Sequence, residues 1–216
     1  MNLAIITLTS EKKDGKFCFF DELNKIVHNN KVTIKEGDVL VISSKFISNS
    51  QGRILNIEKS KVCEKARKIA EKFNANEQFM EIVYRESDKI VGGVTGFAMA
   101  TTNGILAPNA GIDKSNSKGT KIILYPNEPY KFAEELKRKI FLELNLHVGI
   151  IIVDSRLMPA RIGTTGVAIA CAGIEPTKDL RGDKDLDGNP LKVTFQATAD
   201  NLASIANHKM GEGNDL

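Results

Sequence analysis

Four short segments, far apart in the chain, combine polar or charged side chains with glycine. Glycine lets a ligand come close to the backbone, and carboxylate and hydroxyl oxygens are the ligands that hard divalent cations prefer. Exposed backbone amides bind the phosphates that such cations bridge. The chemistry expected here is therefore metal-assisted handling of phosphate. The segments are 109–116 (NAGIDKSN), 154–155 (DS), 161–166 (RIGTTG) and 210–213 (MGEG).

Two aspartates are the main candidates for metal ligands. Asp154 follows the apolar run 148–153, and ligands commonly collect at strand ends in α/β sheets. Ser155 adds a hydroxyl beside it. Asp113 follows Gly111 in the first segment. Magnesium keeps several waters and needs few carboxylates, so two such loops would suit it. From these residues alone, an Asx turn or a local cap stays the alternative for each aspartate.

The two remaining segments suggest contacts to phosphate and metal. Residues 163–166 (GTTG) resemble a phosphate-cradling turn, and Arg161 before them suits a catalytic role, holding developing negative charge bidentately. The alternative is a surface turn with a solvated arginine. Glu212, between Gly211 and Gly213, suits a flexible ligand-binding tail. Its alternative is an ordinary disordered terminus.

Hydrophobic periodicity indicates which elements position these segments. Alternating strands and helices predict a mixed α/β (α+β) fold. The chain is treated as one domain, 1–216, and any division into sub-lobes is expected at the proline-rich turn, giving about 1–126 and 127–216. Strands are predicted at 3–8, 39–42, 122–125, 148–153 and 191–198, and within 92–107 around a turn at 102–104. Helices are predicted at 19–28, 60–73, 77–86, 129–146 and 200–210. Residues 43–53 form a polar segment, and 183–190 are predicted as a loop rich in turns.

Composition narrows the class of protein. The chain has 216 residues, 42% of them hydrophobic and 26% charged, which is typical of a soluble globular protein. A net charge of +3 is too small to indicate a nucleic-acid partner. Three cysteines without metal-ligand spacing indicate reduced thiols. No signal peptide is visible and no apolar run reaches the roughly 18–20 residues that span a bilayer, so a cytoplasmic protein without a membrane partner is expected. Walker A and Rossmann glycine patterns are absent from the sequence.

Several strings together resemble the coenzyme F420 gamma-glutamyl ligase family, in its order and approximate spacing. The resemblance runs from about residue 37 to the C-terminus. It implies an unusual α/β fold and an intertwined homodimer. The strings are 37–41 (GDVLV), 52–53 (GR), 109–116 (NAGIDKSN), 163–173 (GTTGVAIACAG), 179–188 (DLRGDKDLDG), 199–201 (ADN) and 210–215 (MGEGND).

The resemblance implies a ligase that joins L-glutamate through its amine to the terminal carboxylate of a deazaflavin precursor, F420-0, using GTP and Mg²⁺ or Mn²⁺. A carboxylate is a poor acyl donor, so phosphorylation to an acyl phosphate would precede attack by the amine. Phosphoryl transfer depends mainly on positioning and charge neutralisation. Three alternatives stay open: ATP in place of GTP, another carboxylate acceptor, and a non-catalytic descendant that binds a nucleotide or metabolite.

The resemblance also implies roles for individual residues. By position, Asp113 and Asp154 match ligands of one metal, while Ser155, usually threonine in the family, and Glu212 match ligands of a second. Asn116 matches a nucleotide contact. The other nucleotide-contacting positions are Ser44, Lys45, Met210, Gly211 and Gly213. The chain departs from the family at 7–10 (TLTS for a Gly-Leu-Pro loop), 49–53 (NSQGR for KAEGR) and 154–158 (DSRLM for DT-x-GR).

Overall fold

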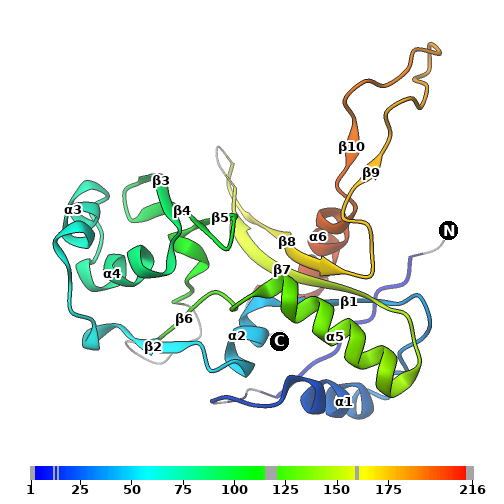
Figure 1. Cartoon of the computed structure of the whole chain (residues 1–216), viewed down its shortest axis with the longest axis horizontal. Helices are drawn as coiled ribbons and strands as arrows, with labels where there is room; N and C mark the ends of the chain where they lie inside the picture. Colours follow the sequence, from blue (N-terminus) through cyan, green and yellow to red (C-terminus); the bar gives the residue numbers. More distant parts are fainter. Residues whose placement is uncertain (1–2, 12, 14, 115–120, 159–160, 213–216) are drawn as a thin grey trace. The chain divides into compact units, whose positions relative to one another are not determined.

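The chain folds into alternating helices and strands (Figure 1), which confirms the predicted mixed α/β class. The structure is a computed structural model that describes residues 3–11, 13, 15–114, 121–158 and 161–212. The elements in order are α1 (Phe19–Asn29), β1 (Val39–Ser43), α2 (Ser44–Ser50), β2 (Ile54–Asn56), η1 (Ile57–Lys59), α3 (Glu64–Lys72), α4 (Glu77–Glu86), β3 (Lys89–Val94), β4 (Phe97–Thr102), β5 (Ile105–Pro108), η2 (Asn109–Gly111), β6 (Lys121–Ile123), α5 (Pro129–Leu144), β7 (Gly149–Leu157), β8 (Thr164–Ala172), β9 (Lys178–Asp179), β10 (Phe195–Gln196) and α6 (Thr198–Met210).

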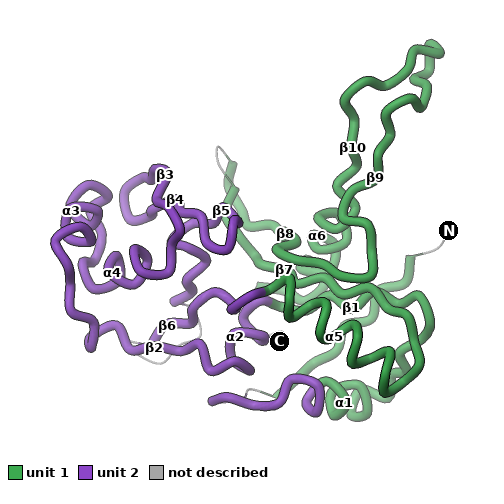
Figure 2. Tube along the Cα trace, viewed as in Figure 1, with its two compact units in different colours: residues 1–12, 23–43, 129–216 green, residues 13–22, 44–128 purple. Residues whose placement is uncertain are grey.

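Two compact units make up the chain, and each combines separate stretches of sequence (Figure 2). Unit 1 comprises residues 1–12, 23–43 and 129–216. Unit 2 comprises residues 13–22 and 44–128. The description as one domain with sub-lobes of about 1–126 and 127–216 stays a prediction.

Unit 1 is built on a three-stranded mixed sheet with the order β1-β7-β8. β1 runs parallel to β7, and β8 returns antiparallel to it. The continuous apolar run in β7 suits a strand covered on both faces, and Ile150, Ile151 and Ile152 are fully buried. Ala199 and Ala203 of α6 pack against alternate residues of β7, beginning with Ile151. Small side chains on this helix therefore bring it close to the sheet.

Unit 2 combines helices α3 and α4 with two small antiparallel sheets, β3-β4-β5 and β2-β6. Asn76 caps α4, because its Oδ1 accepts a hydrogen bond from the Phe79 amide at 2.9 Å. The predicted turn between β4 and β5 is confirmed: Asn103 and Gly104 have φ of 50° and 74°, as a tight hairpin turn requires. Phe79, Met80 and Ile122 are among the most deeply buried residues of this unit's core.

A buried carboxylate on α4 is paired with an exposed arginine. Glu81 is 2% exposed, and its Oε1 lies 2.5 Å from Arg85 Nε. The Cys63 amide donates to Glu81 Oε2 at 2.8 Å. This amide hydrogen bond, with a further contribution from Arg85, lowers the pKa of Glu81 below its usual value. The carboxylate is therefore a structural group.

Most predicted helices are confirmed, but three local expectations are wrong. Residues 3–8 form no strand: most of their apolar side chains are exposed, and the segment has no ladder partner among the described residues. The polar segment 43–53, for which no element was predicted, contains helix α2. β7 continues to Leu157, so Asp154 lies inside the strand. Residues 164–166 belong to strand β8, because they pair with the extension of β7.

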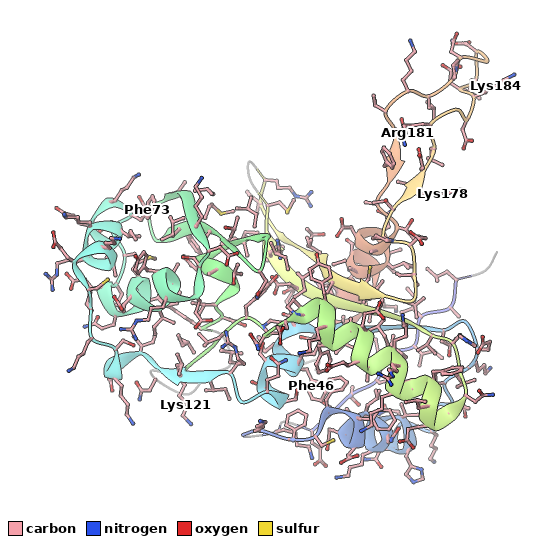
Figure 3. All side chains as sticks on the ribbon, in the orientation of Figure 1. Phe46, Phe73, Lys121, Lys178, Arg181 and Lys184 are labelled. Carbon is pink, nitrogen blue, oxygen red and sulfur yellow. The ribbon has the colours of Figure 1, made fainter. Side chains whose placement is uncertain are left out.

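A long arm between β8 and α6 carries the short strands β9 and β10 (Figure 1). Lys178, Arg181 and Lys184 lie along it (Figure 3). The central carbon of the Arg181 guanidinium lies 4.6 Å from the centre of the Phe195 ring. Hydrogen bonds from Arg181 to the Asp179 carboxylate lower the pKa of Asp179 to about 2. The predicted strand 191–198 shortens to Phe195–Gln196.

The intertwined homodimer stays a prediction.

Among the helices that the structure describes, none has the length and apolar character needed to cross a bilayer.

Candidate active site

Two of the chemically distinctive segments lie on paired strands. Ser155 of β7 is the register partner of Gly166 in β8, and Leu157 is the partner of Thr164. The hairpin that joins these strands therefore places the Asp-Ser pair beside the Gly-Thr-Thr-Gly segment. Side chains alternate between the two faces of a strand, so Ser155 and Asp154 project from opposite faces of β7.

Glu212 joins a third segment to this hairpin. The Ser155 hydroxyl donates to the Glu212 carboxylate, with distances of 2.7 Å to Oε1 and 2.8 Å to Oε2. Thr164 Oγ1 donates to Oε1 at 2.9 Å, and Asn207 Nδ2 donates to the same oxygen at 2.8 Å. We call Ser155, Thr164, Asn207 and Glu212 the Glu212 cluster. Its members come from β7, β8, α6 and the residues that follow α6.

The glycines near this cluster allow α6 to approach the sheet. A Cβ on Gly166 would come within 2.5 Å of both the Ala203 carbonyl oxygen and Asn207 Cβ. Gly166 therefore serves helix packing. The predicted turn is wrong for 164–166, which lie in β8, and phosphate binding by this segment stays a prediction. At the other end, Gly211 ends α6 with φ of 76°, and its amide donates to the Asn207 carbonyl at 3.0 Å. This cap places Glu212 beside Asn207.

Asp154 lies against an arginine that follows it by two residues. Arg156 Nη2 is 3.3 Å from Asp154 Oδ2, and the exposed fractions of the two side chains are 9% and 16%. Residues two apart in a strand share a face, so the pair forms within β7. The residue before Asp154, Val153, pairs with Ser43, the last residue of β1.

In unit 2, Asp113 pairs with a predicted nucleotide contact. Lys45 Nζ in α2 lies 2.6 Å from Asp113 Oδ2. The Asp113 backbone is fixed beside β6, because its amide and carbonyl exchange two 2.9 Å hydrogen bonds with Ile123. Ser44, at the start of α2, is buried. The structure thus brings together Asp113 and Lys45, which the resemblance assigns to metal and nucleotide.

The backbone before Asp113 is strained. Asn109, Ala110 and Gly111 have φ of 50°, 54° and 71°, a region that residues with a Cβ seldom adopt. Asn109 Oδ1 accepts a hydrogen bond from the Ala98 amide at 2.9 Å, which holds the turn. A Cβ on Gly111 would lie 2.1 Å from the Tyr125 ring. Strain that the surroundings enforce is typical of functional sites.

Arg161 is exposed and precedes β8, and Met210 is the half-buried last residue of α6. Gly211 is the cap described above. Asn116 and Gly213 lie outside the described residues.

Four residues of these sites escaped sequence reasoning in whole or in part. Arg156 and Asn207 had no predicted role, and Thr164 was assigned only to a turn. Lys114 places its ammonium 3.5 Å from the centre of the Phe79 ring, and partial burial lowers its pKa. The alternation of β7 could have paired Arg156 with Asp154. The contact of Asn207 with Glu212 depends on where α6 ends, and Gly211 is the only sign of that end in the sequence.

The donor atoms fit a hard cation better than a soft one. Ser155, Thr164 and Glu212 offer oxygen, as Mg²⁺ and Mn²⁺ prefer. Within the described ranges, no group of three or more His, Cys, Asp or Glu side chains gathers in a metal-binding arrangement. A cation at the Glu212 cluster would therefore take one carboxylate with hydroxyls, waters and substrate oxygens. This ligand set is typical of magnesium bound with phosphates.

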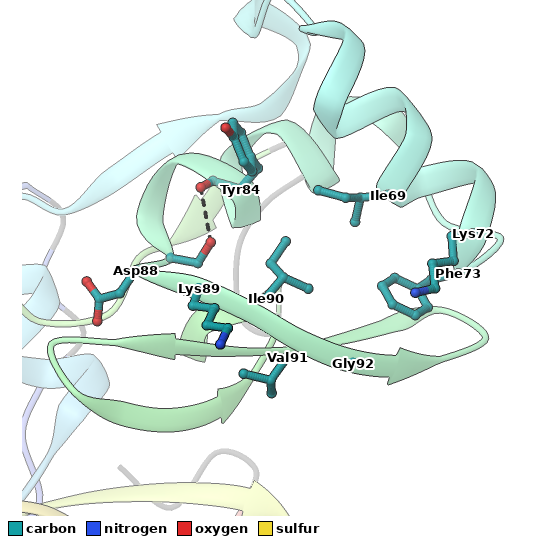
Figure 4. A pocket seen from close by; sticks show the side chains of 10 residues that line it. Ile69, Lys72, Phe73, Tyr84, Asp88, Lys89, Ile90, Val91 and Gly92 are labelled. Carbon is teal, nitrogen blue, oxygen red and sulfur yellow. Dashed lines mark hydrogen bonds between the residues drawn. The ribbon is translucent and has the colours of Figure 1, made fainter.

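A separate cavity of about 400 Å³ lies among α3, α4 and β3 in unit 2 (Figure 4). Its walls combine apolar side chains with two lysines and an aspartate. None of the predicted site residues lines it. The lining residues are Ile69, Lys72, Phe73, Tyr84, Ser87, Asp88, Lys89, Ile90, Val91 and Gly92.

Comparison with known proteins identifies the family. A family model described as F420-0:Gamma-glutamyl ligase matches residues 16–216. The chain belongs to the F420-0:gamma-glutamyl ligase family. The match includes the Glu212 cluster and the Asp113 and Asp154 segments, and it confirms the resemblance found in the sequence. The chain is accordingly an enzyme of the ligase class.

Curated relatives in several archaea carry the name coenzyme F420:L-glutamate ligase. The protein of Archaeoglobus fulgidus is 36% identical over 195 residues, which cover 90% of this chain and 78% of that protein. The protein of Methanocaldococcus jannaschii is 36% identical over 184 residues, covering 84% and 73%. The protein of Halorubrum lacusprofundi is 31% identical over 219 residues, covering 99% and 83%. The similarity therefore extends through both units.

Proposed function

We propose that this ligase joins the amine of L-glutamate to the carboxylate of F420-0, using GTP and Mg²⁺ or Mn²⁺. The observation that carries the proposal is the family match over residues 16–216, which includes every chemically distinctive segment. The names of the curated relatives support L-glutamate as a substrate. GTP, the metals and the acyl phosphate come from the family resemblance and the chemistry of the donor groups.

The proposed reaction has two steps. An oxygen of the acceptor carboxylate attacks the γ-phosphorus of GTP, and GDP leaves. The glutamate amine then attacks the acyl carbon, a C–N bond forms, the C–O bond to phosphate breaks, and the amine loses a proton. The products are an amide that joins the former acceptor carboxyl group to the glutamate nitrogen, GDP and phosphate. Bound divalent cations would neutralise charge on the phosphates.

The candidate residues would have two roles in this reaction, holding the cations and neutralising the charge of the phosphates. The Glu212 carboxylate with the Ser155 hydroxyl would hold one cation, and Asp113 and Asp154 are the carboxylates for the other. That these two aspartates share one metal stays a prediction. Lys45 and Arg161 would place positive charge at the phosphates. At Lys45, the ammonium already lies 2.6 Å from Asp113, so phosphate oxygens would compete with that carboxylate for it.

The direct test mixes purified protein with F420-0, L-glutamate, GTP and Mn²⁺ and follows the glutamylated product by mass spectrometry and phosphate release. We expect product and phosphate in equal amounts, and neither without metal. A parallel reaction with ATP in place of GTP determines which nucleotide the enzyme uses. Phosphate release with another carboxylate acceptor, but not with F420-0, would reject the proposed acceptor. Binding of GTP without turnover across a panel of acceptors would reject catalysis.

A further inference from the structure

Thr164 has the same relation to Glu212 as the predicted metal ligand Ser155. Its Oγ1 lies 2.9 Å from Glu212 Oε1, and Ser155 Oγ lies 2.7 Å from that oxygen. Thr164 is the first residue of β8 and is exposed, so solvent reaches the hydroxyl. Two hydroxyl groups, one from β7 and one from β8, thus meet at the carboxylate that follows α6.

The spacing of these oxygens is that of ordinary hydrogen bonds, and it is also compatible with neighbouring ligands of an octahedral cation. Mg²⁺ binds oxygen at about 2.0–2.1 Å in near-ideal octahedral geometry, so neighbouring ligand oxygens lie about 2.9 Å apart. The three distances from hydroxyl oxygen to carboxylate oxygen here are 2.7, 2.8 and 2.9 Å. Each hydroxyl has lone pairs and can rotate its hydrogen away from Glu212. A cation could therefore use these oxygens after only small movements of the side chains.

We propose that Thr164 supplies a third protein oxygen, beside Ser155 and Glu212, to a divalent cation at the Glu212 cluster. The proposal rests on the metal-dependent function proposed above. Asn207 has a different role, although its Nδ2 also lies 2.8 Å from Glu212 Oε1. An amide nitrogen of this kind donates hydrogen bonds and has no lone pair for a metal. Asn207 is therefore a positioning residue for Glu212.

A sulfur substitution separates a ligand from a hydrogen-bond donor. Thiolate ligands favour soft metals, whereas hydroxyl and carboxylate oxygens favour hard ones. In Thr164→Cys, a direct ligand would shift the preference of the site from Mn²⁺ towards Cd²⁺ and give the ultraviolet absorption of a cadmium–thiolate bond. A residue that only orients Glu212 would lower the affinity for both metals together. Wild-type protein and Thr164→Ser supply the background from Cys18, Cys63 and Cys171.

The experiment measures Mn²⁺ and Cd²⁺ affinities of the full chain by calorimetry, together with the ultraviolet difference spectrum. For Thr164→Val we expect a loss of Mn²⁺ affinity of about 10- to 100-fold, with Thr164→Ser near wild type. For Thr164→Cys we expect a rise of at least about tenfold in the Cd²⁺-to-Mn²⁺ affinity ratio, with the thiolate band. Asn207→Leu should weaken Mn²⁺ binding without changing that ratio.

An unchanged ratio in Thr164→Cys, or wild-type Mn²⁺ affinity in Thr164→Val, would overturn the role of Thr164 while the ligase function stands. Absence of Mn²⁺ binding by the wild-type protein, with or without GTP, would overturn the metal-dependent function as well. Thermal unfolding of each variant checks that it is folded, and the metal preference of Thr164→Cys keeps the test decisive if the valine variant is unstable.

Discussion

The carboxylates proposed to bind metal differ in the partners that hold them. The hydrogen bonds described at Glu212 come from two hydroxyls and an amide, which are neutral donors. Asp113 is paired with the ammonium of Lys45, and Asp154 with the guanidinium of Arg156. Neutral donors orient a carboxylate without cancelling its charge, whereas a cationic side chain competes with a metal for the same oxygens. The first arrangement assists metal binding, and the second opposes it until substrate phosphates draw the cation away.

The largest effect should come from removing either aspartate. In Asp113→Ala and Asp154→Ala, turnover should fall by about 1000-fold or more, because a catalytic metal supplies several kcal/mol of transition-state stabilisation. Glutamylation rates under saturating GTP and Mn²⁺ measure this loss. Circular dichroism must show a folded variant. Retained turnover in either variant would remove that aspartate from the metal-binding set.

Adding a methyl group beneath α6 should disturb the Glu212 cluster indirectly. Gly166→Ala places a Cβ within 2.5 Å of Ala203 O and Asn207 Cβ, so α6 must shift. We expect a loss of about 1–3 kcal/mol in the free energy of unfolding, with weaker Mn²⁺ binding because Asn207 moves. Urea titrations and calorimetry measure the two effects. Gly163→Ala is the matched control, because no described residue lies within 4 Å of a Cβ at this position. The φ of 103° at Gly163 should make the substitution cost stability, while metal affinity persists. Equal losses of Mn²⁺ affinity in both variants would contradict the packing role of Gly166.

Removing the cationic partner of Asp113 should raise Mn²⁺ affinity, whereas removing a hydroxyl partner of Glu212 should lower it. In Lys45→Met, Mn²⁺ affinity should rise about two- to fivefold, as expected for loss of a partly exposed ion pair worth up to ~1 kcal/mol. GTP affinity should fall in the same variant. Separate titrations with Mn²⁺ and with GTP test this reversal. A decrease in Mn²⁺ affinity would show that Lys45 assists the metal and would break the comparison.

The smallest effect on metal should come from a carboxylate that serves the core. Glu81→Gln should leave Mn²⁺ affinity unchanged and lower stability by about 1 kcal/mol, because the amide keeps an acceptor but loses the charge. The folded-state pKa of Glu81 is lowered, so its contribution to stability is complete above the unfolded pKa, near 4.5. It is lost as pH falls through the lower folded-state value. Wild-type and variant stabilities should therefore converge in acid. A difference in the free energy of unfolding between the two proteins that stays constant across about pH 2–7 would contradict the structural role of Glu81.

Sequence patterns were sufficient for the elements whose signals are local. The apolar run of β7, the amphipathic pattern of α4 and the proline at the start of α5 identified these elements correctly. Short α2 was missed, because its polar residues resemble a connection. The family strings located Asp113, Asp154, Ser155 and Glu212.

The sequence could not predict how the site residues are partnered. Thr164 lies 48 residues from Glu212, and the hairpin register and the end of α6 bring the two side chains together. The ion pair between Lys45 and Asp113 likewise depends on tertiary structure. The sequence alone does not distinguish a glycine that permits close helix packing from a glycine in a turn, which explains why a turn was predicted at Gly166.

The most direct test of the account is a titration of wild-type protein and Glu212→Gln with Mn²⁺ in the presence of GTP, followed by electron paramagnetic resonance of the free ion. Glutamine has nearly the same shape and can still accept hydrogen bonds from Ser155 and Thr164, but it lacks the charge that a cation requires. We predict two bound Mn²⁺ per wild-type chain and one per Glu212→Gln chain. Equal stoichiometry and affinity in the two proteins would contradict a metal site at the Glu212 cluster.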